Sequence, residues 1–128
     1  MDVLFVHPNF PGQFRQLAGA LAQMPGMNVH VLGDQSLMSA VELPRINVLS
    51  YPSPEAAGAA THPYVKGFEA GVRRGQQVVR TLLPLKYQGM EPDIIYIHPG
   101  WGDGFYLKDL FPNALIISLF EYYYRCLL

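Results

Sequence analysis

The stretch Val3-Leu-Phe-Val-His-Pro-Asn-Phe-Pro-Gly12 decides the fold of this 128-residue chain. Its four leading apolar residues form a continuous run, which is typical of a strand that is buried on both faces of a sheet. After the turn, apolar residues repeat at helical spacing: Phe14, Leu17, Ala18, Leu21 and Ala22. A second apolar run, Val29–Leu32, follows the helix breakers Pro25 and Gly26. These segments predict a β-α-β unit with parallel strands, and such units are almost always right-handed.

The rest of the chain continues the alternation of strand and helix. The pattern predicts strands over Asn47–Tyr51, Pro92–His98 and Ala114–Phe120, and helices over His62–Tyr87 and Gly104–Leu110. Such alternation predicts a Rossmann-like α/β fold, with a doubly wound parallel sheet in three layers (αβα) and a single domain over residues 1–128.

The long helix expected over His62–Tyr87 carries an apolar stripe of Val65, Phe68, Val72, Val79, Leu82 and Leu83. We expect Thr61 to cap its first turn, where Pro63 is well tolerated. Arg73, Arg74 and Arg80 fall mostly off the stripe, so a solvated face is favoured over an anion-binding patch.

The composition is that of a domain with few charges. Half of the residues are hydrophobic and 15% are charged, below the usual share of roughly a quarter, so we expect another domain, a partner or a membrane face to cover some apolar surface. The net charge of −1 argues against nucleic acid as a ligand. The single cysteine, Cys126, excludes an internal disulfide, and no spacing of His, Asp or Glu predicts a metal site. No signal peptide or run of ~18 apolar residues is apparent, so we expect a cytoplasmic protein without a transmembrane segment.

A second stretch, Ile94-Ile-Tyr-Ile-His-Pro-Gly-Trp-Gly-Asp103, marks the candidate site. Its apolar run stops at His98, and ligands of open α/β sheets bind just outside the carboxyl ends of the strands. His98 can donate a hydrogen bond to a sugar hydroxyl or phosphate, or act as an acid or base, and its position favours these roles over that of a packed core histidine. His7 ends the first strand in the same way, and for it a site role and a structural role are equally open.

Three other side chains follow strand ends. Trp101 either stacks on a sugar ring or fills the core, and Asp103 either acts as a base or caps the next helix. Glu121 follows the fifth strand, where a carboxylate can accept hydrogen bonds from hydroxyl groups.

Gly12 and Gln13 lie where the first strand leads into the first helix. A helix N-terminus offers free N–H groups and the positive end of a dipole, so phosphate or carboxylate can bind there. The loop does not match G-x-G-x-x-G, and no Gly-Lys-Ser/Thr follows it. For Gly12, a ligand-binding turn and a plain structural turn therefore both stay open.

Five motifs occur in order along the chain and are similar to those of a known family. They are FVHPNFPGQF (5–14), THPY (61–64), PDII with HPGWG (92–95 and 98–102), LKDLFP (107–112) and FEYYYR (120–125). Together they resemble the N-terminal domain of a glycosyltransferase family 4 group, whose members are bacterial retaining enzymes of the GT-B fold. The resemblance implies a cleft between two Rossmann-like domains, in which the N-terminal domain mainly holds the acceptor and the C-terminal domain holds the nucleotide-sugar donor.

The resemblance also implies roles for individual residues. His98 would contact the transferred sugar, and Gly12 would line the cleft near the donor phosphates. Their positions at strand ends, more than the resemblance, predict that Trp101, Glu121 and the residues around Asn9 line the acceptor side, with Gln13, Gly100 and Gly102 as binding residues in the same loops. The implied partners are a nucleotide-sugar and a glycan or small-molecule acceptor, with no cofactor.

The chain departs from the family pattern because it ends at Leu128, without a donor-binding domain. One half of the cleft cannot stabilise the leaving diphosphate, so we expect no appreciable transferase activity from this chain alone. The alternative is a non-catalytic Rossmann-like binding or dimerisation module, which would pair as a homodimer through Tyr122–Tyr124 and the apolar end Cys126–Leu128. A flavodoxin-like domain is disfavoured, since no phosphate loop rich in Ser, Thr or Gly follows the first strand. The inner membrane face is an alternative location.

Overall fold

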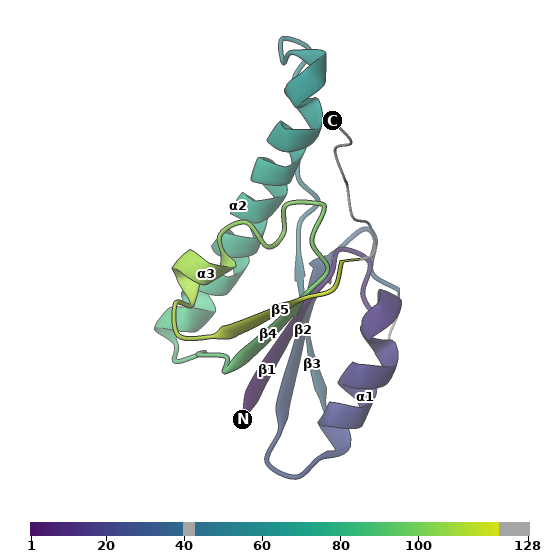
Figure 1. Ribbon diagram of the computed structural model, residues 1–128, viewed down its shortest axis with the longest axis vertical. Helices are drawn as coiled ribbons and strands as arrows, with labels where there is room; N and C mark the ends of the chain where they lie inside the picture. The colour runs from purple at the N-terminus through teal and green to yellow at the C-terminus, as the bar shows by residue number, and fades with distance from the viewer. Residues whose placement is uncertain (40–42, 121–128) are drawn as a thin grey trace, which may run out of the picture.

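The computed structural model describes residues 1–39 and 43–120. Its strands are β1 (Asp2–Val6), β2 (Asn28–Asp34), β3 (Ile46–Tyr51), β4 (Ile94–Ile97) and β5 (Leu115–Ser118). Its helices are α1 (Arg15–Gln23), α2 (Lys66–Tyr87) and α3 (Leu107–Leu110), with 3-10 turns η1 (Gly12–Phe14) and η2 (Pro63–Val65). Every predicted strand and helix is therefore present, with ends that differ by a few residues (Figure 1).

The five strands form one sheet in the order β3-β2-β1-β4-β5, and every pairing is parallel. β1 lies in the middle because its residues Val3–Val6 are apolar on both faces and fully buried. The chain adds β2 and β3 on one side of β1, and then β4 and β5 on the other. The predicted doubly wound α/β fold is confirmed, with its switch point between β1 and β4.

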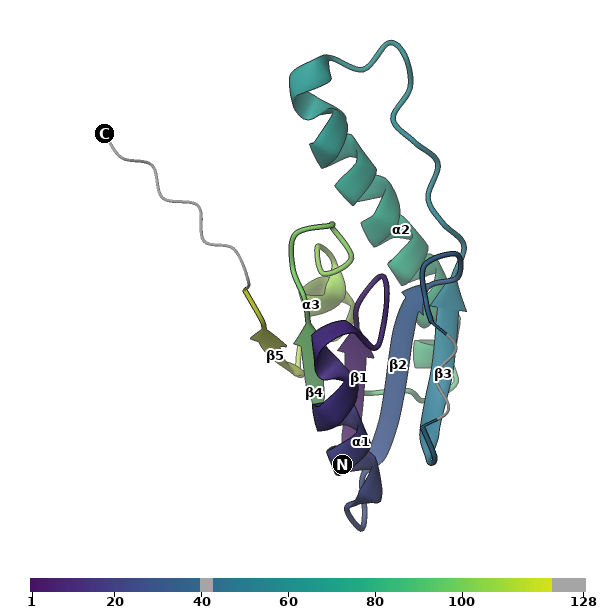
Figure 2. The same cartoon turned by 90° about the vertical axis from the view of Figure 1, so that its right-hand side faces the viewer.

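Helices cover the sheet on both faces, which gives three layers (Figures 1 and 2). On one face, Val3 and Phe5 pack in a cluster with Phe14 and Ala18 from the region of α1. On the other face, Leu4 and Val6 pack in a cluster with residues of α2 and α3, including Val78, Leu82, Leu107 and Leu110. Successive side chains of β1 point to opposite faces of the sheet, so they contribute in turn to two hydrophobic cores, one on each face.

Of the apolar stripe predicted for α2, only Leu82 is buried, and Val72, Val79 and Leu83 are partly buried. The buried residues of α2 are Gly71, Gly75, Val78 and Leu82, whereas Val65 and Phe68 are exposed. The reason is length: 22 helical residues span about 33 Å, so the first turns of α2 rise beyond the sheet (Figure 1). The capping prediction was also wrong, because the side chain of His62 accepts the Tyr64 N–H and the Thr61 hydroxyl donates to Glu69 instead.

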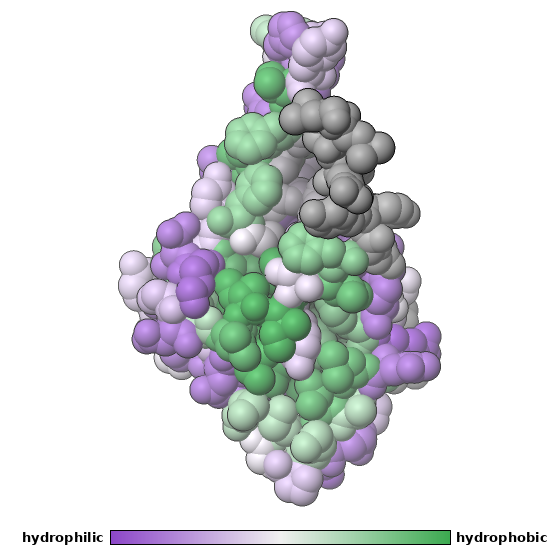
Figure 3. Space-filling view, viewed as in Figure 1, coloured by the Kyte–Doolittle hydropathy of each residue, from purple (hydrophilic) through white to green (hydrophobic). Residues whose placement is uncertain are grey.

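The outer strand β5 leaves apolar surface exposed. Leu115 and Ile117 are 59% and 38% exposed, and they lie beside Ile94 and Tyr96 of β4 in the parallel register. Apolar side chains gather over this part of the sheet (Figure 3). The low share of charged residues is therefore accompanied by an exposed apolar surface on the described part of the chain.

Candidate functional site

Two histidines meet at the switch point of the sheet. His7 follows β1 and His98 follows β4, and because Val6 pairs with Ile97 the two imidazoles come to the same edge, with ring centroids 4.8 Å apart. Both side chains are buried. Ligands of doubly wound sheets bind at this kind of crevice, so the fold brings both histidines to the expected place.

Trp101 lies over this histidine pair. Its ring stacks on His98 at 4.7 Å and 28°, and its centroid is 5.7 Å from that of His7. The side chain is 45% exposed, so Trp101 does not fill the core. We name His7, His98 and Trp101 the ring stack; its indole is partly open to solvent, and aromatic faces of this kind can pack against a sugar ring.

The loop after β1 fixes the orientation of His7. The Asn9 N–H donates to Nδ1 of His7 at 3.2 Å, so Nε2 carries the proton of a neutral ring and donates to Oε1 of Gln13 at 3.0 Å. Gly12 has φ +44°, and a Cβ there would lie 2.7 Å from His7 Nε2. A side chain at position 12 would collide with His7, so the structure itself requires glycine there. Asn9, Gly12 and Gln13 are all exposed.

The two glycines beside Trp101 differ in their surroundings. Gly100 has φ +130°, is exposed, and has no neighbour within 4 Å of an added Cβ. Gly102 has φ +93° and is buried against α2, where a Cβ would lie 2.1 Å from the carbonyl oxygen of Gly71. The loop after β4 is therefore anchored to α2 through a contact that leaves no room for a side chain.

Asp103 is a buried carboxyl group without a hydrogen-bond partner among the described residues. Its side chain is 0% exposed, and neither carboxylate oxygen is hydrogen-bonded. Burial raises the pKa of Asp103 to about 7, although the charge of Arg74 and the neighbouring N–H groups of Asp103 and Gly104 lower it. The capping alternative was wrong, because the residue before α3 is Tyr106 and no side chain caps that helix.

A second polar cluster, which the sequence reading missed, lies at the carboxyl ends of β2 and β3. Nη1 of Arg74 donates to Asp34 Oδ2 at 2.8 Å and to the Tyr51 hydroxyl at 2.9 Å. Asp34 and Tyr51 are buried. The prediction of a solvated face was wrong for Arg74, because its side chain is 16% exposed. We name Asp34, Tyr51 and Arg74 the charge cluster. A signal existed, since Tyr51 ends one predicted strand and Asp34 closely follows another, just as His98 ends a third.

Ionisation within the charge cluster is well defined. Burial alone would raise the pKa of Asp34, but hydrogen bonds from the Ser53 hydroxyl, the Ser36 N–H and hydroxyl, and Arg74 hold it below its ordinary value. Burial raises the pKa of Tyr51 to about 12, and the hydrogen bond from Arg74 opposes that rise. At neutral pH the cluster therefore holds one carboxylate, one guanidinium and one neutral phenol.

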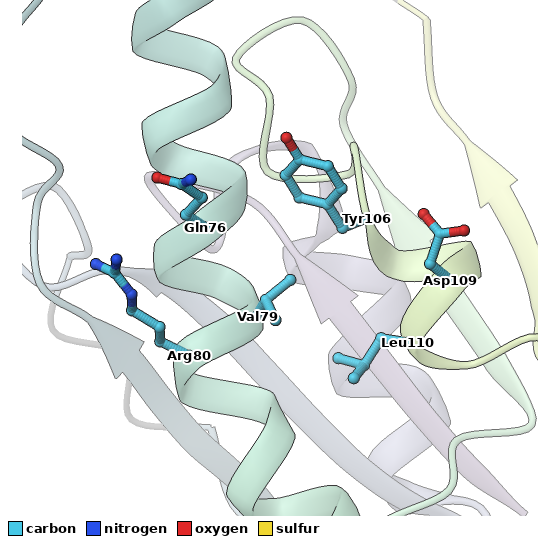
Figure 4. A pocket seen from close by; sticks show the side chains of 6 residues that line it. All are labelled: Gln76, Val79, Arg80, Tyr106, Asp109 and Leu110. Atoms are coloured by element: carbon cyan, nitrogen blue, oxygen red, sulfur yellow. The ribbon is translucent and has the colours of Figure 1, made fainter.

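A shallow groove of about 470 Å³ lies apart from these groups, between α2 and α3. Its lining residues are Gln76, Val79, Arg80, Tyr106, Asp109 and Leu110 (Figure 4). None of the residues predicted for the site lines it.

Several predictions concern other features of the chain. Glu121, Tyr122–Tyr124 and Cys126–Leu128 lie outside the described residues. Within residues 1–39 and 43–120, no three His, Cys, Asp or Glu side chains are grouped to hold a metal. No helix in that part of the chain is long and apolar enough to cross a membrane.

The fold and the ring stack define a class, namely a Rossmann-like α/β domain with a candidate site at the switch point, where β1 and β4 end side by side. A sequence model of the glycosyl transferase family 4 group matches residues 25–127, so the chain belongs to that family. The match includes His98 and Trp101 and begins after the loop of Asn9, Gly12 and Gln13. Membership implies sugar substrates. Comparisons with curated proteins and with solved structures gave no significant match.

Proposed function

We propose that this chain is the acceptor-side domain of a family 4 glycosyltransferase that transfers a sugar from a nucleotide-sugar donor with retention of configuration. The observation that carries the proposal is the ring stack, which combines two imidazoles with a half-exposed indole at the switch point of the sheet. Family membership supplies the chemistry, and the stack supplies a place for a sugar. In the complete enzyme a second Rossmann-like domain would face this edge in a GT-B arrangement.

The proposal gives each loop a role. His98 contacts the transferred sugar, and Trp101 offers its open face to the acceptor. The exposed backbone at Gly12 and Gly100 allows a ligand to approach closely, while Asn9 and Gln13 offer amide groups for hydroxyls. Gly102 acts indirectly, because its contact with Gly71 holds the loop that carries Trp101.

We also propose that the chain alone transfers little or no sugar. Breaking the donor bond leaves a diphosphate whose growing charge must be stabilised. Asp34 balances the charge of Arg74, so the cluster at the ends of β2 and β3 offers hydrogen-bond donors but no net positive charge to the diphosphate. Robust transfer by the 128-residue chain from uridine or guanosine diphosphate sugars, measured by product formation, would contradict this part of the proposal.

The binding role can be tested with the single tryptophan of the chain. Because Trp101 lies in the ring stack, its fluorescence should respond when mono- and disaccharides bind. H98A should weaken that response, while H62A, an exposed histidine before α2, should leave it unchanged. If no saccharide at millimolar concentration changes the Trp101 signal or the nearby amide resonances, the acceptor role is wrong.

A non-catalytic dimerisation module is the second candidate function. The exposed apolar residues Leu115 and Ile117 on the edge strand β5 favour it, because such an edge can pair with another chain. Light scattering measures the oligomeric state directly. A strictly monomeric protein at high concentration would exclude this candidate.

A further inference from the structure

Only one nitrogen of the Arg74 guanidinium is hydrogen-bonded within the described residues. Both of its hydrogen bonds leave from Nη1, whereas Nε and Nη2 donate to no described residue. The side chain is 16% exposed, and these two nitrogens are not among the buried atoms that lack a partner, so they reach solvent. A guanidinium has five N–H donors, and Nε with Nη2 forms the planar fork that fits a carboxylate or a phosphate.

Asp34 and Tyr51, which hold Arg74, are themselves fixed by the fold. Oδ1 of Asp34 accepts from the Ser36 N–H and from the hydroxyls of Ser36 and Ser53, which leaves Oδ2 for Arg74. The Tyr51 hydroxyl accepts a second bond, and the guanidinium carbon lies 5.8 Å from the centre of the Tyr51 ring. Because the rotamers of Arg74 are fixed when the protein folds, a ligand would not have to order this side chain.

The charges around Arg74 leave room for an anion. Asp34 neutralises the guanidinium, and the raised pKa of Asp103 keeps that nearby carboxyl partly protonated at neutral pH. A second ionised carboxylate would make the surroundings negative and oppose an anionic ligand. Ser36 and Ser53 are exposed beside the cluster, but their hydroxyls donate to Asp34, so the anion is held by Arg74 itself.

The charge cluster and the ring stack share one edge of the sheet. The Asp34 N–H donates to the Pro8 carbonyl at 2.8 Å, which ties the end of β2 to the loop after His7. Neighbouring strands lie about 4.8 Å apart, so β2 and β4 end roughly 10 Å from each other across β1. This separation of the strand ends is about the length of one or two sugar rings.

We propose that Arg74 is the receptor for an anionic group of the acceptor, which is a carboxylate, as in a sugar acid, or a phosphate, as in a phosphorylated sugar. This inference rests on the proposed acceptor role. Nε and Nη2 hold the anion, Asp34 and Tyr51 position the guanidinium, and the neutral part of the ligand lies against the ring stack.

The experiment is a titration of the full chain with glucose, glucuronate, glucose 6-phosphate and inorganic phosphate, followed by the Nε–Hε NMR signals of the arginines and by Trp101 fluorescence. Glucuronate or glucose 6-phosphate should bind at least tenfold more tightly than glucose and shift the Arg74 signal. Preference for one of the two identifies the source of the anion. If neither acid binds more tightly than glucose, the proposal is overturned.

Two matched variants separate the receptor from the scaffold. R74K keeps a cation beside Asp34 but removes the fork, so it should lose about tenfold in anion affinity while circular dichroism and Tm show a folded protein. R80K makes the same change on an exposed part of α2 and should bind anions as the native protein does. Equal anion affinity in R74K and the native protein would overturn the inference.

The same titration distinguishes this inference from the proposed function. If glucose alters Trp101 fluorescence and the anions show no dependence on Arg74, the acceptor role stands and the anion receptor is wrong. If the anions bind through Arg74 and no saccharide affects Trp101, the acceptor role is wrong and Arg74 binds anions for another purpose. If R74K is unfolded, the Nε–Hε shift of Arg74 in the native protein decides alone.

Discussion

Replacing Asp103 by Asn should remove a penalty that the native protein suffers as the pH rises. The carboxyl is 0% exposed and burial raises its pKa to about 7, so the folded state holds this proton more tightly than the unfolded chain does. Between the ordinary value of 3.8 and about 7, the folded protein binds more protons than the unfolded one. The free energy of unfolding must then fall as the pH rises through this window, and level off above it.

The size of the effect follows from the same two values. The shift from 3.8 to about 7 corresponds to about 4 kcal/mol over the whole window, of which about 2.5 kcal/mol falls between pH 5 and pH 8. Asn has nearly the shape of Asp and carries no charge at any pH. D103N should lack this loss, so it should gain about 2.5 kcal/mol relative to the native protein when the pH is raised from 5 to 8.

Urea denaturation at pH 5, 6, 7 and 8 measures the effect. His30, whose pKa is lowered chiefly by burial, titrates in both proteins and cancels in the difference. D109N, an exposed Asp→Asn change in α3, should leave the pH dependence of stability as it is in the native protein. Parallel curves for D103N and the native protein would refute the reasoning, since Asp103 would then ionise at its ordinary pKa or move to solvent.

The remaining predictions concern packing and surface. G102A should destabilise the domain by about 3 kcal/mol, because its Cβ would lie 2.1 Å from the Gly71 carbonyl oxygen. G100A has room for a Cβ and should cost only about 1 kcal/mol, from backbone strain at positive φ. Thermal unfolding of the two variants compares these losses. R74M should cost about 3 kcal/mol, because it leaves the buried Asp34 unpaired, and adding D34N should restore part of that loss in urea denaturation. If the native protein self-associates in light scattering, I117K should reduce that association with little change in Tm, and unchanged association would show that β5 is not the contact.

The sequence predicted the parts of this fold that depend on local pattern. The run Val3–Val6 is apolar at every position, as a strand buried on both faces of a parallel sheet requires, and it occupies the middle of the sheet. His98 and His7 were placed correctly at one edge, because the carboxyl ends of parallel strands meet there. That these rings contact each other depends on β1 and β4 being neighbours, a pairing between segments about 90 residues apart.

What the sequence did not reveal depends on contacts between distant segments. Arg74 resembles a solvated arginine in its helix, and only the fold brings it to Asp34 and Tyr51. Gly71 and Gly75 carry no hydrophobic signal, yet they form the buried side of α2 because the loop after β4 packs directly on the helix backbone. Periodicity detects large apolar side chains and is blind to such close approaches.

The contact between Gly102 and Gly71 links the two polar groups of this edge. The loop after β4 has an open side, which carries Trp101, and a buried side, where Gly102 and Asp103 lie toward α2. Arg74 is three residues after Gly71, so both lie on one face of the helix, within one turn. A shift of α2 would therefore move the anchor of Trp101 and the guanidinium together. The ring stack and the charge cluster thus share α2 as their scaffold, and a ligand that bridges them would hold that helix against the strand ends.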